Sequence, residues 1–188
     1  CATTLPPVSS GDLSVCEGAA TPTLSVTVAA NETADWYDVA TGGTALAIGT
    51  TSYSPFGGTA GVYVFYVETR NTGNGCLSNS RTPITLTINV LPTANAGVDA
   101  SFCEGGTAIL NGAGTGGGTL VYGWSPATGL DDPASATPIF TPGAAGSANF
   151  TLTVTDANGC SATDAVDLAI EPKPLLALGS PVCNGLVY

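Results

Sequence analysis

The stretch N-F-T-L-T-V-T-D-A-N-G-C, Asn149 to Cys160, alternates apolar residues with threonine and then runs into Asn-Gly-Cys. The alternation is typical of a half-buried β-strand, and Asn-Gly marks a tight turn. A similar stretch, G-V-Y-V-F-Y-V-E-T-R-N-T-G-N-G-C, runs from Gly61 to Cys76. The sequence therefore contains two copies of one β module.

A second cysteine precedes each of these stretches in a nearly identical phrase. Cys16 lies in V-C-E-G and Cys103 in F-C-E-G, 87 residues apart, and one tryptophan follows each cysteine, Trp36 and Trp124. A period of this length marks whole domains, since solenoid repeats run about 20 to 50 residues. We therefore expect two domains, in which the tryptophans are core anchors rather than ligand-stacking groups.

Composition narrows the class of protein. Charged residues make up 9% of the chain, hydrophobic residues 44%, and the net charge is −11. The apolar strands argue against disorder, and so negative a chain disfavours nucleic acid and anionic membranes, because both require clustered Lys and Arg. No apolar run approaches the roughly 20 residues of a membrane-spanning helix. Six cysteines suit an oxidising compartment, with buried free thiols as the alternative. We expect a mature extracellular or cell-surface protein, or a segment cut from one.

No catalytic centre is recognisable. The chain has no His, the usual general base and the commonest metal ligand, and no Ser, Lys or carboxylate pair stands in a known motif. Loop carboxylates at Asp99, Asp131, Asp132 and Asp156 are of the type that binds Ca²⁺, but their spacing matches no known loop and favours solvated acids. We therefore expect a protein that is not an enzyme and uses no cofactor or metal.

Short strands separated by Gly, Pro and Asn turns follow one another along both modules, and no window shows the periodicity of a helix. The predicted strands span residues 24–28, 34–39, 45–48, 62–67, 82–90, 108–111, 120–126, 137–141, 150–155 and 165–170. This pattern is typical of β-sandwiches. The expected fold class is all-β, with two tandem immunoglobulin-like β-sandwiches and extended termini.

The motifs resemble two known kinds of domain. Residues 93 to 172 resemble a PKD-type domain, an immunoglobulin-like sandwich, through Y-G-W-S-P-A-T-G-L from Tyr122 and V-T-D-A-N-G-C from Val154. Residues 7 to 92 resemble the Ig-like repeats of very large secreted surface proteins of Bacteroidetes-type bacteria, through V-C-E-G, W-Y-D, G-G-T and N-G-C. The second module departs from many PKD domains, because W-S-P-A-T-G-L replaces W-D-F-G-D-G. Such domains serve as spacers, adhesins and filament subunits alike.

Four segments follow from this resemblance. We expect an N-terminal extended lead-in (1–6), an Ig-like sandwich (7–92), a PKD-like sandwich (93–173) and an apolar C-terminal tail (174–188). The tail is either a donor strand or the start of a further module.

The positions of the cysteines suggest how they pair. If Cys16 and Cys103 each precede the second strand of their sandwich, and Cys76 and Cys160 each stand at the last hairpin, each pair can meet at one pole of the fold. We therefore predict intramolecular Cys16–Cys76 and Cys103–Cys160 disulfides, which stabilise small domains by closing long loops.

Two cysteines remain, Cys1 and Cys183. Cys183 lies in V-C-N-G, 80 residues after Cys103, as though a third module began there. The tail cannot close a sandwich alone, so its backbone and apolar face should seek an open sheet edge on a neighbour. The predicted donor-strand residues are Leu175, Leu176, Leu178, Val182, Leu186, Val187 and Tyr188.

These features predict a structural subunit of an extracellular filament or surface fibre. The tail would dock on the N-terminal region of the next copy by strand addition, with Cys183 bonded to Cys1 of that copy. A head-to-tail contact of this kind does not close on itself. The expected partners are copies of the chain itself, without nucleic acid and without membrane insertion.

The alternative function is a cell-surface adhesion or binding module excised from a longer multi-domain repeat protein. Such a module would recognise a glycan or a surface protein. A cluster of exposed aromatics beside the loops would favour it, and the candidates are Tyr37, Tyr53, Phe56 and Tyr63.

Overall fold

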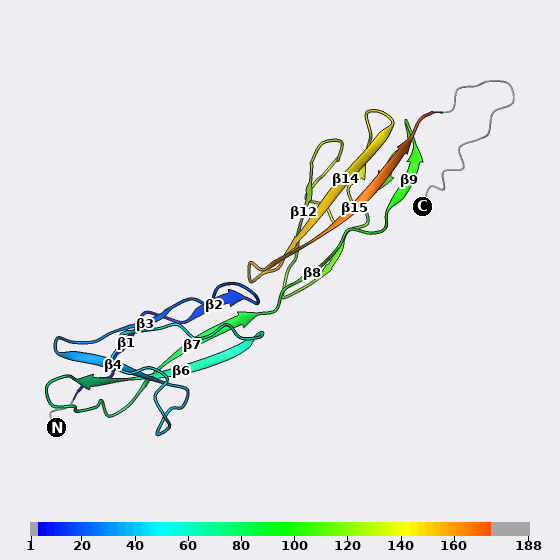
Figure 1. Ribbon diagram of the computed structural model, residues 1–188. Helices are drawn as coiled ribbons and strands as arrows, with labels where there is room; N and C mark the ends of the chain where they lie inside the picture. Colours follow the sequence, from blue (N-terminus) through cyan, green and yellow to red (C-terminus); the bar gives the residue numbers. More distant parts are fainter. Residues whose placement is uncertain (1–3, 174–188) are drawn as a thin grey trace, which may run out of the picture. The chain divides into compact units, whose positions relative to one another are not determined.

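The computed structural model describes residues 4–173, and the chain divides into two compact units, Cys1–Val90 and Leu91–Tyr188 (Figure 1). Every regular element of the described residues is a strand, so this part of the chain contains no helix that would span a membrane. The predicted fold class, all-β with tandem immunoglobulin-like sandwiches, is confirmed.

The first unit packs a four-stranded sheet, in the order β2-β7-β6-β4, against a three-stranded sheet, in the order β1-β3-β5. Its strands are β1 (Val8–Ser9), β2 (Leu13–Cys16), β3 (Leu24–Thr27), β4 (Glu32–Tyr37), β5 (Ser52–Tyr53), β6 (Gly61–Asn71) and β7 (Thr82–Asn89). β2 runs parallel to β7, whereas β7, β6 and β4 pair in antiparallel fashion. The first strand of the larger sheet therefore lies beside its last.

Alternation along the strands decides which side chains fill the core of the first unit. On β7, Ile84, Leu86 and Ile88 are buried, while the residues between them face away from the core. Trp36 on β4 is fully buried, and its indole N–H donates to the carbonyl oxygen of Thr50 at 2.9 Å. The tryptophan therefore fills the core and ties it to a neighbouring loop.

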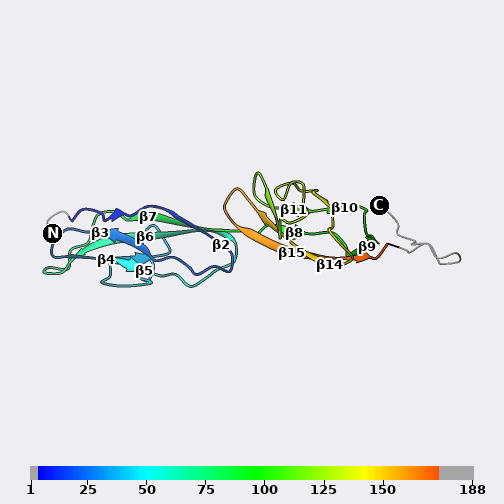
Figure 2. The same ribbon diagram turned by 90° about the horizontal axis from the view of Figure 1, so that it is seen from above.

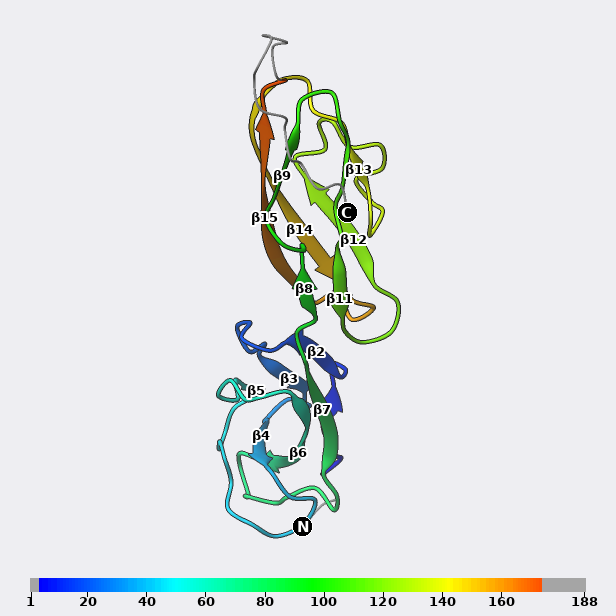
Figure 3. The same ribbon diagram turned by 90° about the vertical axis from the view of Figure 1, so that its right-hand side faces the viewer.

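The second unit is a sandwich with a four-stranded sheet on one side and two short pairs on the other (Figure 2). The larger sheet has the order β12-β14-β15-β9, and the short pairs are β8 with β11 and β10 with β13. The strands are β8 (Thr93–Asn95), β9 (Ala100–Cys103), β10 (Ala108–Ile109), β11 (Ala113–Thr115), β12 (Val121–Ser125), β13 (Ile139–Phe140), β14 (Gly146–Thr155) and β15 (Ser161–Glu171). β9 runs parallel to β15, repeating the arrangement of β2 and β7 (Figure 3).

The core of the second unit follows the same rule. Phe150, Leu152 and Val154 are buried along β14, and the threonines between them face outward. Trp124 on β12 is buried among them, and its indole N–H donates to the carbonyl oxygen of Ser135 at 3.1 Å. Each unit therefore encloses its own hydrophobic core around one tryptophan.

The Asn-Gly-Cys stretch forms the turn between β14 and β15. The Asp156 N–H donates to the carbonyl oxygen of Cys160 at 2.9 Å, and the Gly159 N–H donates to the carbonyl oxygen of Asp156 at 3.0 Å. Gly159 has a φ of +79°, which L side chains rarely adopt. The glycine after Asn158 therefore closes the hairpin and places Cys160 at its end.

Candidate assembly site

The carboxylate of Asp156 organises the turn that carries Cys160. Its Oδ1 accepts from the backbone N–H of Asn158 at 2.9 Å and of Cys160 at 3.0 Å, and its Oδ2 accepts from the N–H of Gly117 at 3.2 Å. Burial of this side chain acts to raise its pKa, but the hydrogen bonds from Cys160, Gly117 and Asn158 outweigh burial and hold the pKa below the ordinary 3.8. The ionised carboxylate is therefore part of the native turn.

The stability of the second unit should fall in acid because of Asp156. A carboxyl whose folded pKa is depressed contributes stability above its unfolded pKa of 3.8, and this stability is lost as the pH falls through the folded pKa. Urea unfolding followed by Trp124 fluorescence, in a Trp36→Phe background, should show this loss below about pH 4. The Asp156→Asn variant should have a lower free energy of unfolding than the wild type at pH 7. Below about pH 4 its free energy of unfolding should change less with pH than that of the wild type.

The exposed carboxylate of Glu171 in the same unit supplies the matched control. Glu171→Gln should keep the pH profile of the wild type. If Asp156→Asn keeps that profile as well, the role of Asp156 in acid sensitivity is wrong.

In the first unit the two cysteines lie at opposite ends of the larger sheet. Cys16 lies opposite Asn89, the last residue of β7, next to the end of the sheet where β6 begins. The carbonyl oxygen of Cys76 accepts from the N–H of Asn71, the last residue of β6, at 2.9 Å. β6 is 11 residues long, so about 33 Å separates the two ends.

The second unit repeats this placement. Cys103 lies opposite Glu171, the last residue of β15, whereas Cys160 directly precedes Ser161, the first. β15 is 11 residues long, so these two cysteines are also about 33 Å apart.

The predicted Cys16–Cys76 and Cys103–Cys160 bridges are therefore wrong, because a disulfide requires Cα atoms within about 7 Å. The reason is the parallel pairing of β2 and β9, which takes each Val-Cys or Phe-Cys phrase to the end of the sheet opposite the Asn-Gly-Cys hairpin. Cys16, Cys76 and Cys160 are nonetheless disulfide-bonded residues. The bonded cysteines thus lie at the ends of the units, not across their middles.

The remaining residues predicted for assembly lie outside the described part of the chain. These residues are Cys1, Cys183, Leu175, Leu176, Leu178, Val182, Leu186, Val187 and Tyr188. The proposed inter-subunit disulfide and donor strand remain predictions.

The N-terminal lead-in of the first unit carries exposed apolar side chains, although Thr4 forms a β-bridge with Ser78 and the Pro7 carbonyl oxygen accepts from the Thr82 Oγ1 at 2.6 Å. β1 pairs with β3 alone among the described strands. Leu5 is 75% exposed and Val8 is 67% exposed beside this edge. An edge strand with unpaired backbone groups and exposed apolar side chains is a template for pairing with another chain.

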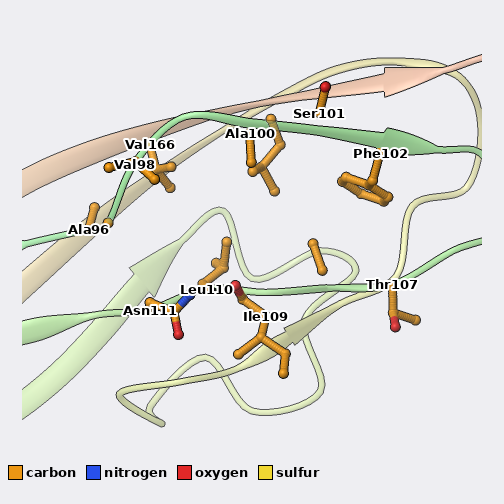
Figure 4. Close-up of a pocket in the computed structure, with 13 residues that line it drawn as sticks. Ala96, Val98, Ala100, Ser101, Phe102, Thr107, Ile109, Leu110, Asn111 and Val166 are labelled. Atoms are coloured by element: carbon orange, nitrogen blue, oxygen red, sulfur yellow. Dashed lines mark hydrogen bonds between the residues drawn. The ribbon is translucent and has the colours of Figure 1, made fainter. Parts of the chain in front are cut away.

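A groove of about 180 Å³ opens between β9 and β10 of the second unit (Figure 4). Phe102 on β9 and Leu110, just after β10, point into the space between the two strands, while Ser101 and Ile109 point away from it. No charged residue lines the groove. Within residues 4–173, β9 pairs with β15 alone and β10 with β13 alone, so both strands present unpaired edges here.

A buried ion pair on the outer face of the first unit was not expected from sequence. The Arg81 Nε lies 3.1 Å from the Glu68 Oε2, and the two side chains are only 8% and 10% exposed. The Arg81 Nη1 donates to the carbonyl oxygens of Val39 and Gly42 at 2.8 Å each. The guanidinium carbon lies 3.3 Å from the centre of the Tyr37 ring. This arrangement fastens the loop after β4 to the sheet.

The tyrosine of this cluster is strongly perturbed. Its hydroxyl donates to the Glu68 Oε1 at 2.6 Å. Burial, followed by this hydrogen bond to Glu68, raises the pKa of Tyr37 to about 12. Tyr37 is therefore a neutral structural donor at physiological pH.

The aromatics considered for adhesion do not gather into one exposed cluster. Tyr37 lies in the ion-pair cluster, and Tyr53 packs against Trp36 with ring centroids 5.6 Å apart. The Tyr63 hydroxyl donates to the carbonyl oxygen of Thr59 at 2.7 Å. Phe56 is 99% exposed and differs from the other three.

The loop carboxylates considered for Ca²⁺ accept hydrogen bonds from backbone N–H groups. Asp131 accepts from the N–H of Ile139 at 2.7 Å, and Asp99 accepts from the N–H of Asp167 at 2.9 Å. The described residues contain no group of three or more acidic or Cys side chains arranged to hold a metal ion.

Comparison with known families identifies the first unit. Residues 4–89 match the model of the family described as "Ig-like domain CHU_C associated". No curated protein matches the chain.

Several solved structures are similar to the chain. The PKD domain from the KIAA 1837 protein is 22% identical, covers 46% of this chain and 92% of its own, and has a TM-score of 0.39. The fibronectin(III)-like modules of CbhA from Clostridium thermocellum are 12% identical over 88% of this chain and 94% of theirs, with a TM-score of 0.44. Extracellular domains 3–5 of Drosophila OTK are 11% identical over 90% of this chain and 60% of theirs, with a TM-score of 0.49.

Proposed function

We propose that this chain, whose residues 4–89 match the Ig-like domain family and whose second unit is also an immunoglobulin-like sandwich, is a structural subunit of an extracellular filament or surface fibre. Such domains are surface modules of binding or structural type rather than enzymes. In the proposal, copies join head to tail: the tail, residues 174–188, adds a strand to the next copy, and Cys183 bonds Cys1 of that copy.

The observation that carries this proposal is the placement of the cysteines at both ends of each unit. A bridge across the middle of a sandwich stabilises that sandwich alone. A cysteine at the end of a sheet is placed to bond a chain segment or module that arrives there. Cys16, Cys76 and Cys160 are bonded within the single chain, so they brace the ends of the units and support a stiff subunit, while the links between copies are assigned to Cys1 and Cys183.

The exposed edge of β1 supports the choice of acceptor. Leu5 and Val8 offer an apolar surface there, and β1 has one unpaired side within the described residues. The apolar tail of another copy is a suitable strand for that side, because strand addition satisfies backbone groups and apolar side chains together.

The proposal is tested by polymerisation of the purified full chain under oxidising conditions. Gels without reductant should show a ladder of covalent multimers that collapses to monomer when reductant is added. Peptides linking Cys1 to Cys183 should be found in the multimer bands. Electron microscopy of the same sample should show fibres.

The paired variant Cys1→Ser with Cys183→Ser supplies the control. It should lose the ladder while keeping the urea midpoints of both units. Dispersed monomers from the oxidised wild type, or Cys1–Cys183 peptides in the monomer band, would overturn the fibre proposal.

A second candidate function is an adhesion module of a longer repeat protein. The family match of the first unit and the fully exposed Phe56 favour it. Binding of the monomeric chain to a glycan array, lost in Phe56→Ala, is the result that would support this candidate over the fibre.

A further inference from the structure

Among residues 4–173, no strand covers the groove between β9 and β10. Within the described part of the chain, β9 pairs with β15 and β10 with β13, so the other edge of each strand can accept a further strand, and backbone groups are costly to bury without such a partner. Phe102 and Leu110 point into it and are only 9% and 2% exposed, so the floor of the groove is the hydrophobic core of the unit (Figure 4). An apolar cavity of about 150 Å³ is large enough to take a benzene-sized group, so this groove has room for an aliphatic side chain.

The chain leaves the second unit next to this groove. Glu171, the last residue of β15, lies opposite Cys103, the last residue of β9. The N–H of Lys173 lies 3.5 Å from the Glu104 Oε2, directly beyond the end of β9. The tail that follows therefore starts at the end of the groove.

The distance to the free edge of β9 can be spanned by the linking residues. A strand added there would lie two strand spacings from β15, about 9.6 Å. The three residues Pro172, Lys173 and Pro174 reach about 10 Å when extended. Each residue before a proline is also held in an extended conformation, which favours a full crossing over a tight bend.

The first residues of the tail match the groove in length and chemistry. Residues 175–178 read L-L-A-L, four residues against the four of β9. Leu176 and Leu178 fall on one face of an extended strand. No residue from 174 to 188 is charged, and the groove has no charged lining. Gly179-Ser180-Pro181 then interrupts the strand pattern.

We propose that residues 175–178 of the chain's own tail close this groove as an added strand, antiparallel to β9. The tether of three residues gives this segment a high local concentration, which a strand from another molecule lacks. This proposal for residues 175–178 does not depend on whether copies of the chain assemble. It narrows the donor of the proposed fibre to the far part of the tail, from Val182 to Tyr188.

Hydrogen exchange of the full-length chain tests the proposal. At a concentration where the chain is monomeric, the β9 amides that β15 does not bond should be protected. Leu176→Asp combined with Leu178→Asp should speed their exchange by at least about 10-fold, since a free edge strand opens readily. Leu186→Asp combined with Val187→Asp is the matched control and should leave the protection of β9 unchanged.

Two results would overturn the proposal. Equal exchange of the β9 amides in the wild type and in the Leu176/Leu178 variant would mean that the segment does not cover this edge. Protection that appears only as protein concentration rises would place the tail of a second copy in the groove. Concentration-independent protection in a chain that never polymerises would support the proposal while counting against the fibre.

Discussion

Replacing Trp124 with Ala is expected to lower the free energy of unfolding of the second unit by about 3–5 kcal/mol, as for other buried aromatics. Trp124 is 4% exposed, and its hydrogen bond to the Ser135 carbonyl would be lost as well. Domains usually unfold with about 5–15 kcal/mol in total. The variant should therefore unfold at a much lower urea concentration than the wild type.

Trp36 provides the control within the same molecule. In Trp124→Ala it is the remaining tryptophan, and its fluorescence should report a first unit that unfolds at the wild-type urea concentration. Far-UV circular dichroism should then show an earlier transition from the second unit. Trp36→Ala should give the mirror result. A circular dichroism transition that stays at the wild-type midpoint in Trp124→Ala would refute its role as a core anchor.

Replacing Arg81 with Met should lower the free energy of unfolding of the first unit by about 3–5 kcal/mol, because removing one partner of a buried pair leaves the other charge uncompensated. The carboxylate of Glu68 would keep the Tyr37 hydroxyl but lose its cation. The carbonyl oxygens of Val39 and Gly42 would lose their donor. Urea unfolding followed by Trp36 fluorescence in a Trp124→Phe background measures the change.

A double-mutant cycle separates charge from packing at this pair. Adding Glu68→Gln to Arg81→Met should recover part of the lost stability, because the buried charge is removed while an acceptor for Tyr37 remains. Arg81→Lys should remain less stable than the wild type. The lysine ammonium cannot both stack on the Tyr37 ring and bond the three oxygens that the planar guanidinium holds. A cost below about 1 kcal/mol for Arg81→Met would place the pair among weak surface ion pairs.

The sandwich layers were predictable because the alternation of residues along a single strand shows which side of that strand faces the core. The alternation of Ile84, Leu86 and Ile88 on β7, and of Phe150, Leu152 and Val154 on β14, assigns each strand an inner face. The Asn-Gly dipeptide likewise predicts a hairpin. The two-residue strands β1 and β5 were missed because so short a segment has no period.

The pairing of cysteines was not predictable because it depends on contacts far apart in sequence. The phrases around Cys16 and Cys103 look the same whether their strands run parallel or antiparallel to the last strand of the module. Because these strands run parallel to the last strand, each cysteine lies at the end of the sheet opposite the one that an antiparallel strand would give it. The cluster of Arg81 was missed for a similar reason, since Arg81 precedes β7 while its partners Glu68 and Tyr37 lie on β6 and β4.

The parallel pairing of β2 with β7 also has a mechanical consequence. The chain enters β2 at Leu13 and leaves β7 at Asn89, so stretching the unit by its ends pulls the two strands in opposite directions along their length. The hydrogen bonds between them then bear the tension together, unlike those of a hairpin peeled open from one end. β9 and β15 repeat this geometry. Each unit therefore resists traction along the chain through bonds that share the force.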